Sequence, residues 1–172
     1  HWPNPKMFRE NWAESNAETW RAFEKLYRDG KVRAIGVSNF LPHHLEELFK
    51  TAEIKPMVNQ IEMQVGLNRE KEREFNSKHG LLTEACAPFQ IGEVLKDKTV
   101  CAIAENLGKT SAQIVLRWFL QLGVVPLPKS VTPTRILENF SVYDFELSVD
   151  EMKILNNIKP HNPRHNPDTI DF

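Results

Sequence analysis

The sequence has 172 residues, and its 22 basic and 23 acidic side chains leave a formal net charge of -1 at pH 7. This near-neutral charge gives no reason to expect nucleic acid or an anionic membrane as a partner, and no apolar run approaches the roughly 20 residues of a membrane-spanning helix. Only two cysteines occur, Cys86 and Cys101, which excludes a disulfide framework and favours a reducing, cytoplasmic setting. The length fits one domain with a buried core.

The chain opens on His1 rather than methionine, and the first residues are polar and proline-containing. Such an opening does not resemble a signal peptide. We therefore expect that the chain has been cut before His1 or that its first residues are missing.

Hydrophobic spacing and turn residues predict alternating helices and strands. For the first helix, Asn16 is the expected N-cap and Gly30 the expected stop. In chain order, the predicted elements are a helix over 17–28, a strand over 32–37, a helix over 43–52, a strand over 57–61, a helix over 69–79, a strand over 81–85, helices over 99–107 and 111–122, a strand over 124–127, and helices over 132–140 and 149–158.

Four strands that alternate with helices imply parallel pairing with crossover helices. The strands are short and apolar with little alternation, as expected when both faces are buried. An open doubly wound sheet and part of a (β/α)8 barrel both fit this pattern. No Gly-x-Gly-x-x-Gly or Walker-type loop follows any strand. Because a complete barrel takes about 250 residues, four units would form half of one, and two strand edges would stay open.

Polar residues follow the first two predicted strands. Ser38 and Asn39 suit hydrogen bonding to a neutral polar group such as a carboxamide, and turn chemistry explains the same pair equally well. Asn59 and Gln60 lie in an apolar strand, where a buried amide must be hydrogen-bonded. We interpret this second pair as structural slightly more readily than as functional.

The clearest chemical signal follows the fourth predicted strand. Lys129 and Ser130 come directly after it, and Arg135 and Asn139 lie on the next helix. A lysine, a hydroxyl, the amides of a helix start and an arginine together favour an anion such as phosphate. A solvated basic face is the alternative, and it would require neither Ser130 nor the helix start.

Three stretches resemble motifs of the aldo-keto reductase family in order and spacing. They are GKVRAIGVSNF over 30–40, VNQIE over 58–62 and LPKSVTPTRILEN over 127–139. The opening His1-Trp2-Pro3 resembles the His-aromatic-Pro segment at the end of the family's fourth barrel strand. The resemblance covers essentially the whole chain. It implies that residues 1–172 are the C-terminal part of a single (β/α)8 barrel domain, without barrel strands 1–3.

The resemblance also implies roles for individual residues. His1 would be the catalytic histidine that polarises a substrate carbonyl, and Trp2 would line the substrate pocket. The other implied residues bind NADP(H): Ser38, Asn39 and Gln60 at the nicotinamide carboxamide, Cys86 at the nicotinamide ring, Phe89 beside the pyrophosphate, Lys129, Ser130 and Arg135 at the adenosine 2′-phosphate, and Glu138 and Asn139 at the adenine.

The chain departs from the family pattern in two places. Cys86 replaces the aromatic residue that stacks on nicotinamide, and its thiol has no π face; we interpret it as a small packing residue rather than a reactive thiol. The family's Tyr, Lys and Asp catalytic residues all precede the matched region, and neither Tyr27 nor Tyr143 lies in the donor's motif. Because carbonyl reduction needs a general acid, we expect the 172-residue chain alone to be inactive.

Other histidines have ordinary explanations. His43 and His44 are followed closely in the sequence by acidic residues. We interpret this pattern as an exposed first helical turn rather than a metal site, so we predict no metal. His161 and His165 are expected in a surface loop. By resemblance to the family, residues 162–172 would form a tail that closes over the substrate pocket.

Two kinds of function remain open. The first is an NADPH-dependent reductase of small-molecule aldehydes or ketones, active in the complete protein and monomeric if the barrel is complete. The second is a truncated or diverged protein that binds nucleotide or a partner without turnover. A Tyr-bearing strand before His1 would distinguish the first from the second.

Overall fold

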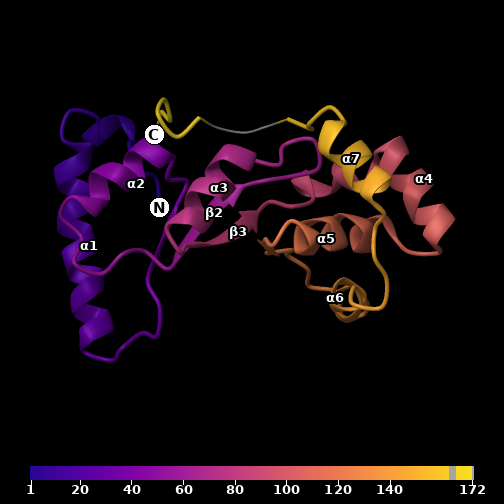
Figure 1. The fold of residues 1–172 in the computed structure, drawn as a ribbon, viewed down its shortest axis with the longest axis horizontal. Coiled ribbons are helices and arrows are strands. Elements are labelled where there is room, and N and C mark those ends of the chain that lie inside the picture. The colour runs from indigo at the N-terminus through magenta and orange to yellow at the C-terminus, as the bar shows by residue number, and fades with distance from the viewer. Residues whose placement is uncertain (163–165, 172) are drawn as a thin grey trace. The chain divides into compact units, whose positions relative to one another are not determined.

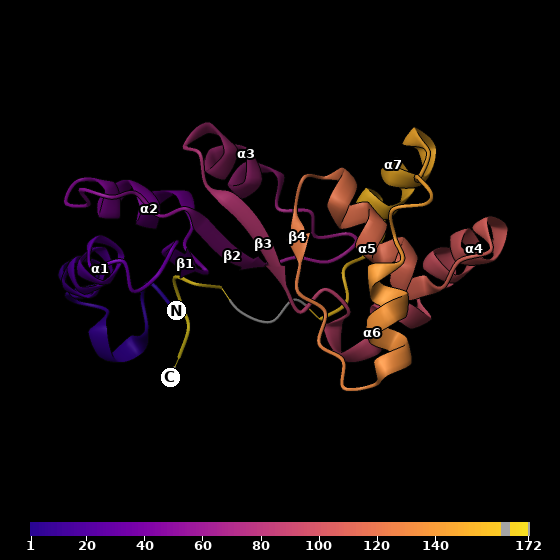
Figure 2. The same cartoon turned by 90° about the horizontal axis from the view of Figure 1, so that it is seen from below.

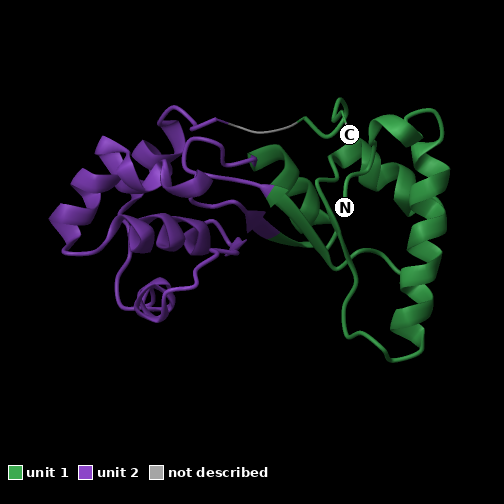
Figure 3. Cartoon of the chain, turned by 180° about the vertical axis from the view of Figure 1, so that it is seen from behind, with its two compact units in different colours: residues 1–61, 70–83, 164–172 green, residues 62–69, 84–163 purple. Residues whose placement is uncertain are grey.

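The computed structural model describes residues 1–162 and 166–171, and the chain divides into two units that we treat separately (Figure 3). Unit 1 comprises residues 1–61, 70–83 and 164–172, and unit 2 comprises residues 62–69 and 84–163. None of the helices within these described residues combines the length and apolar character that a membrane crossing requires.

Within its described residues, unit 1 contains one 3-10 helix, three α-helices and the first strands of a parallel sheet (Figure 1). Its elements are the 3-10 helix η1 (Lys6–Phe8), α1 (Trp12–Arg28), β1 (Gly36–Ser38), α2 (Pro42–Phe49), β2 (Val58–Glu62), α3 (Glu70–Lys78) and the start of β3 (Leu82–Cys86). Strands β1 and β2 pair in parallel, with Gly36 opposite Val58 and Ser38 opposite Gln60. The carboxyl ends of the two strands therefore lie side by side.

Unit 2 contains the end of β3 and the remaining helices (Figure 2). Its other elements are the 3-10 helices η2 (Gln90–Gly92) and η3 (Val94–Lys96), α4 (Lys98–Leu107), α5 (Ser111–Gln121), β4 (Val125–Pro126), α6 (Pro133–Phe140) and α7 (Val149–Asn157). Strands β3 and β4 pair in parallel through Glu84 and Val125. The strand order β1-β2-β3-β4 confirms the predicted sequence of parallel strands joined by helices.

The core of unit 1 forms where α1 and α2 meet the sheet. Its buried members are Trp20, Ile35, Phe40, Leu45, Leu48 and Leu81. The indole N–H of Trp20 donates to the Ile54 carbonyl at 2.8 Å, so burial of the ring leaves no donor unpaired. Gly36 has a steric role, because a Cβ there would lie 2.8 Å from the Val58 carbonyl oxygen.

The core of unit 2 is built around α5, whose inner side chains are fully or almost fully buried: Ile114, Val115, Leu116, Trp118 and Phe119. The Trp118 indole donates to Asn156 Oδ1 at 2.9 Å, which ties α5 to α7. Trp20 of unit 1 and Trp118 of unit 2 are thus both buried, each with its indole N–H paired.

Two predicted boundaries are wrong near the N-terminus. Helix α1 begins at Trp12 after Asn11, five residues before the predicted start, so Asn16 is not its N-cap. The Trp12 ring contacts His44 edge-on at 5.1 Å, a tertiary contact that the local sequence does not reveal. The first strand begins at Gly36 rather than at residue 32, because residues 31–34 are exposed and lie outside the sheet. Most other boundaries agree closely with prediction, although α2 ends at Phe49 rather than Ala52.

Candidate functional site

Polar groups after β1 and β2 come together in unit 1. Ser38 Oγ and the Asn39 backbone N–H both donate to the Gln60 carbonyl, at 3.1 and 2.8 Å. The Asn39 amide Nδ2 lies 3.2 Å from Ser38 Oγ and 3.5 Å from the His1 carbonyl oxygen. The structure therefore gathers Ser38, Asn39, Gln60 and His1 into one cluster, and the ring of Trp2 lies 5.6 Å from that of His1.

The backbone of Asn39 turns the chain from β1 towards α2. Its φ of 63° lies in the left-handed region, which asparagine tolerates better than most residues. The side chain is 7% exposed, so its amide is held among the neighbouring polar groups. This local conformation places the Ser38 and Asn39 side chains at the strand end.

The neighbouring Asn59 has a structural role, as the sequence favoured. It is completely buried, and its Nδ2 donates to the Phe40 carbonyl at 2.9 Å and to Asn76 Oδ1 at 3.2 Å. Asn76 in turn donates to Thr83 Oγ1 at 3.0 Å. This network connects β2, α3 and the start of β3.

Unit 2 contains a cavity of about 410 Å³ after β4. Phe89 from the loop after β3 lines it, together with residues of the segment that leads into α6 and of α6 itself: Lys129, Ser130, Thr132, Arg135, Glu138 and Asn139. The structure thus brings together the predicted anion-binding residues and Phe89, which was predicted beside the pyrophosphate, and it adds Thr132 to them. Cys86 is half-buried at the end of β3 and is not part of this lining.

The cavity is electrostatically suited to an anion. Within residues 1–162 and 166–171, neither Lys129 nor Arg135 forms a salt bridge. The one carboxylate in the lining, Glu138, accepts a hydrogen bond from Thr110 Oγ1 at 2.6 Å. Ser130 Oγ accepts from the Thr132 backbone N–H at 3.2 Å and shapes the turn into α6. Two cations and a hydroxyl therefore face one cavity, a donor set that matches phosphate.

The loop after β3 is conformationally unusual. Ala87, Gln90 and Ile91 all have positive φ values, of 51°, 44° and 56°. Such backbone is costly for residues with a side chain and persists only where the surroundings hold it. Gln90 is buried, and its Nε2 donates to Glu62 Oε1 at 2.7 Å. Sequence reasoning missed this Glu62–Gln90 anchor, because nothing local connects residues so far apart.

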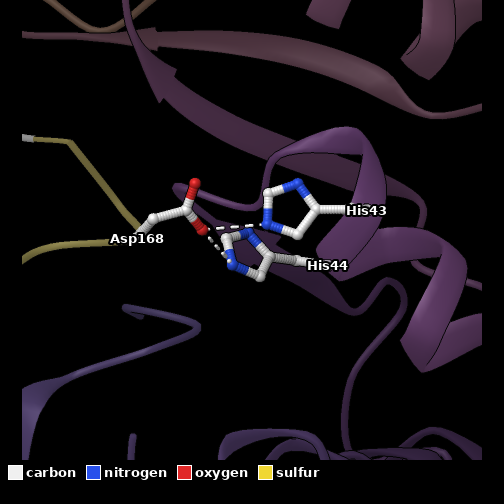
Figure 4. A group of neighbouring side chains, drawn as sticks. All are labelled: His43, His44 and Asp168. Carbon is white, nitrogen blue, oxygen red and sulfur yellow. Dashed lines mark hydrogen bonds and ion pairs between the residues drawn. The ribbon is translucent and has the colours of Figure 1, made fainter.

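His44 is the clearest correction to the sequence analysis. It is 1% exposed, whereas an exposed helical turn was expected. Its Nε2 lies 2.9 Å from Asp168 Oδ1, and His43 Nε2 lies 2.8 Å from the same oxygen (Figure 4). Glu46 and Glu47, the acids that follow the two histidines in the sequence, do not belong to this cluster of three. The partner carboxylate comes instead from the C-terminal segment.

The hydrogen bonding of His44 disfavours a metal ion in this cluster. The Leu41 backbone N–H donates to His44 Nδ1 at 3.1 Å, so the proton of the neutral ring resides on Nε2. Metal-binding histidines show the opposite arrangement, in which the second ring nitrogen donates. Burial, followed by the neighbouring His43, lowers the pKa of His44 to about 4, so the ring is neutral near pH 7. In this cluster His43 is hydrogen-bonded to Asp168, and the neutral His44 ring lies against the same carboxylate oxygen.

The described part of the C-terminal segment, residues 166–171, docks on unit 1. Besides the contacts of Asp168, Arg9 Nη2 donates to the Ile170 carbonyl at 2.8 Å, and Lys6 pairs with Asp171 at 3.0 Å. The Ile170 side chain is buried. Polar contacts and the burial of an apolar side chain therefore both attach this segment to unit 1.

Of the two histidines that were expected in a surface loop, His161 and His165, the structure describes only His161. His161 is half-buried in unit 2, where it lies 3.2 Å from Asp97 and its backbone exchanges two hydrogen bonds with the Gln64 amide. It is therefore more closely held than the expected surface loop. His165 lies outside the described residues.

A parallel α/β sheet with polar groups after its strand ends defines a class of protein whose sites lie at the carboxyl ends of the strands. The model of the Aldo/keto reductase family matches residues 1–160, and the chain belongs to that family. It is 46% identical to glyoxal reductase of Bacillus subtilis over the whole chain, and 46% identical to 9,11-endoperoxide prostaglandin H2 reductase of Trypanosoma cruzi over 89% of it.

Solved structures agree with this assignment. The chain is similar to a crystal structure of Gox0644 without ligand and to one of a Gox0644 variant in complex with NADPH. Each comparison has a TM-score of 0.88 and 38% identity, and covers all of this chain and 62% of the other. The chain likewise spans 60% of glyoxal reductase and 52% of the trypanosomal reductase. Its fold is that of part of a (β/α)8 barrel.

Proposed function

We propose that the whole protein is an NADPH-dependent reductase that converts small-molecule aldehydes or ketones into alcohols. The observation that carries this proposal is the cavity of unit 2, where Lys129 and Arg135 face the same space without a carboxylate partner among the described residues. Membership of the aldo/keto reductase family and the NADPH complex of a relative support it. NADPH, when bound, supplies the hydride.

The residues of unit 2 would bind the adenosine end of the cofactor. Lys129 and Arg135 would pair with the 2′-phosphate, and the Ser130 hydroxyl would donate a hydrogen bond to it. Glu138 and Asn139 would contact the adenine, and Phe89 would lie beside the pyrophosphate. A 2′-phosphate is what distinguishes NADPH from NADH, so this cavity would decide cofactor preference.

The cluster in unit 1 would bind the nicotinamide end. The Ser38 hydroxyl and the Asn39 and Gln60 amides are donors and acceptors that match a carboxamide. Holding the carboxamide fixes which ring face is turned to the substrate, and orientation of this kind supplies much of an enzyme's rate. Cys86 would meet the ring without stacking on it.

His1 and Trp2 would act on the substrate. The imidazole of His1 would donate a hydrogen bond to the carbonyl oxygen and polarise it, and Trp2 would line the pocket. The Tyr, Lys and Asp that the resemblance implies would come from residues preceding His1. We accordingly propose that residues 1–172 form the C-terminal part of a single barrel domain and are inactive alone. In the complete protein we expect a cytoplasmic monomer that does not bind nucleic acid.

Cofactor affinities measured by calorimetry test this function. Arg135→Ala and Lys129→Ala should each weaken NADPH binding roughly 10- to 100-fold, since each removes a charge-assisted contact, and should change NADH binding little. Lys153→Ala removes an exposed lysine of α7 outside the cavity and is the matched control. Equal losses for both cofactors would contradict the 2′-phosphate assignment.

Turnover distinguishes the reductase from a protein that binds nucleotide without catalysis. The complete protein should oxidise NADPH in the presence of an aromatic aldehyde, and the 172-residue chain should not. Steady turnover by the 172-residue chain would show that the missing Tyr donor is not needed. Tight NADPH binding without turnover by the complete protein would favour the non-catalytic alternative.

A further inference from the structure

Helix α5 begins with a reciprocal capping box. Thr110 is the N-cap, and its Oγ1 accepts a hydrogen bond from the Gln113 backbone N–H at 3.3 Å. The side chain of Gln113 accepts one from the Thr110 backbone N–H at 3.0 Å. Each of these side chains keeps a donor that capping does not use.

Both spare donors contact α6. Thr110 Oγ1 donates to Glu138 Oε1 at 2.6 Å, and Gln113 Nε2 donates to the Ser141 carbonyl at 2.8 Å. Glu138 lies in the last turn of α6 and Ser141 is its C-cap, so both contacts hold the C-terminal end of the helix. Helix α6 lies beside α5 in both views (Figures 1 and 2).

Apolar packing contributes little to the placement of α6. The helix buries none of its eight residues. Ile136, Leu137 and Phe140 are more than half exposed, and they border a cavity of about 690 Å³ that α5 and β4 also line. The two hydrogen bonds from the α5 cap therefore help to hold α6 beside α5, together with the bond from Arg117 Nη1 to the Val142 carbonyl at 3.3 Å.

The Thr110 contact also affects the charge balance of the 410 Å³ cavity. Arg135 and Glu138 are three residues apart on one helix, a spacing at which opposite charges pair. Glu138 instead bonds to Thr110, and Arg135 has no salt bridge in the described part of the chain. A carboxylate that paired with Arg135 would compete with a phosphate for the guanidinium.

We infer that Thr110 and Gln113 are positioning residues for 2′-phosphate recognition. They hold α6 against α5, and Thr110 keeps the Glu138 carboxylate away from Arg135. The inference rests on the proposed binding of NADPH. It adds two residues outside the cavity lining that set the preference for a phosphorylated ribose.

Calorimetric titration with adenosine 2′,5′-bisphosphate and with adenosine 5′-monophosphate tests the inference. Loss of the charge-assisted contact in Thr110→Val should weaken bisphosphate binding roughly three- to tenfold and monophosphate binding less than about twofold. Thr110→Ser keeps the hydroxyl and should restore the wild-type ratio. Gln113→Leu removes the second contact and should weaken bisphosphate binding in the same direction.

Ser148→Ala is the matched control. Ser148 caps α7 through the same kind of capping box, with Glu151 at the third helical position. Its loss weakens a helix cap without touching α6, so the affinity ratio of the two probes should stay at the wild-type value. A similar loss of bisphosphate affinity in Ser148→Ala would attribute the effect to general destabilisation and overturn the inference.

Other outcomes separate the inference from the proposed function. If the wild-type protein binds both probes equally, the 2′-phosphate assignment and the inference both fail. If it prefers the bisphosphate and Thr110→Val and Gln113→Leu keep that preference, the positioning role alone fails. In a Glu138→Gln background, Thr110→Val should have a smaller effect on bisphosphate binding. An undiminished effect there would contradict the competition between Glu138 and the phosphate.

Discussion

The Leu41 backbone N–H and His44 Nδ1 are joined by a hydrogen bond of 3.1 Å, and this contact determines the chemistry of the cluster around Asp168. Because Nδ1 is an acceptor, Nε2 of the neutral ring bears a proton 2.9 Å from Asp168 Oδ1. A buried histidine at the start of α2 is thereby linked to the C-terminal segment.

The stability of the protein should depend on pH through His44. Burial and His43 lower its pKa from 6.5 to about 4, and Asp168 opposes this shift. Between pH 4 and pH 6.5 the unfolded chain therefore binds more protons than the folded chain. The contribution of His44 to the free energy of unfolding is complete above pH 6.5 and is lost as the pH falls towards 4. The loss is on the order of 3 kcal/mol.

Thermal denaturation of wild type and His44→Gln at pH 7.5, 5.5 and 4.5 measures this effect. Glutamine at this third helical position does not titrate, and it can still accept the Leu41 N–H as in a capping box. The difference in melting temperature between the two proteins should narrow or reverse as the pH falls. A constant difference would show that His44 does not titrate in this range.

Asp168→Ala should destabilise the attachment of the C-terminal segment. It removes the carboxylate that bonds to His43 Nε2 at 2.8 Å and lies 2.9 Å from the buried His44 Nε2, at a cost of about 1–3 kcal/mol. Asp171→Ala removes only an exposed ion pair with Lys6, with both side chains about two-thirds exposed, and should cost less than about 1 kcal/mol. Urea denaturation of the two variants compares them directly, and equal costs would contradict a special role for Asp168.

Zinc should not bind to His43, His44 and Asp168 as a stoichiometric site. Ligation through His44 Nε2 would move the ring proton to Nδ1, where it would face the Leu41 N–H. Calorimetric titration with zinc chloride should show only weak binding that His44→Gln leaves unchanged. One tightly bound zinc ion per chain, lost in that variant, would mean that the loop around Leu41 rearranges to accept it.

Much of the fold was predictable because it depends on local physics. The periodic apolar residues predicted helices whose ends agree closely with the structure, in which Asp97, Thr110 and Ser148 cap three of them. The predicted ends were wrong where a contact with a residue distant in the sequence sets the end of a helix or strand. Helix α1 extends to Trp12, which packs on His44, and β1 is limited to the residues that pair with β2.

The sequence by itself determined the order of strands and helices, the family, and the grouping of Lys129, Ser130 and Arg135, which lie within a few positions of one another and line one cavity. Only the tertiary structure decided which distant groups meet: Thr110 with Glu138, Gln90 with Glu62, and His44 with Asp168. Hydrogen bonds between side chains depend on ångström-scale distances and on burial, and chain folding sets both across separations that no local pattern encodes.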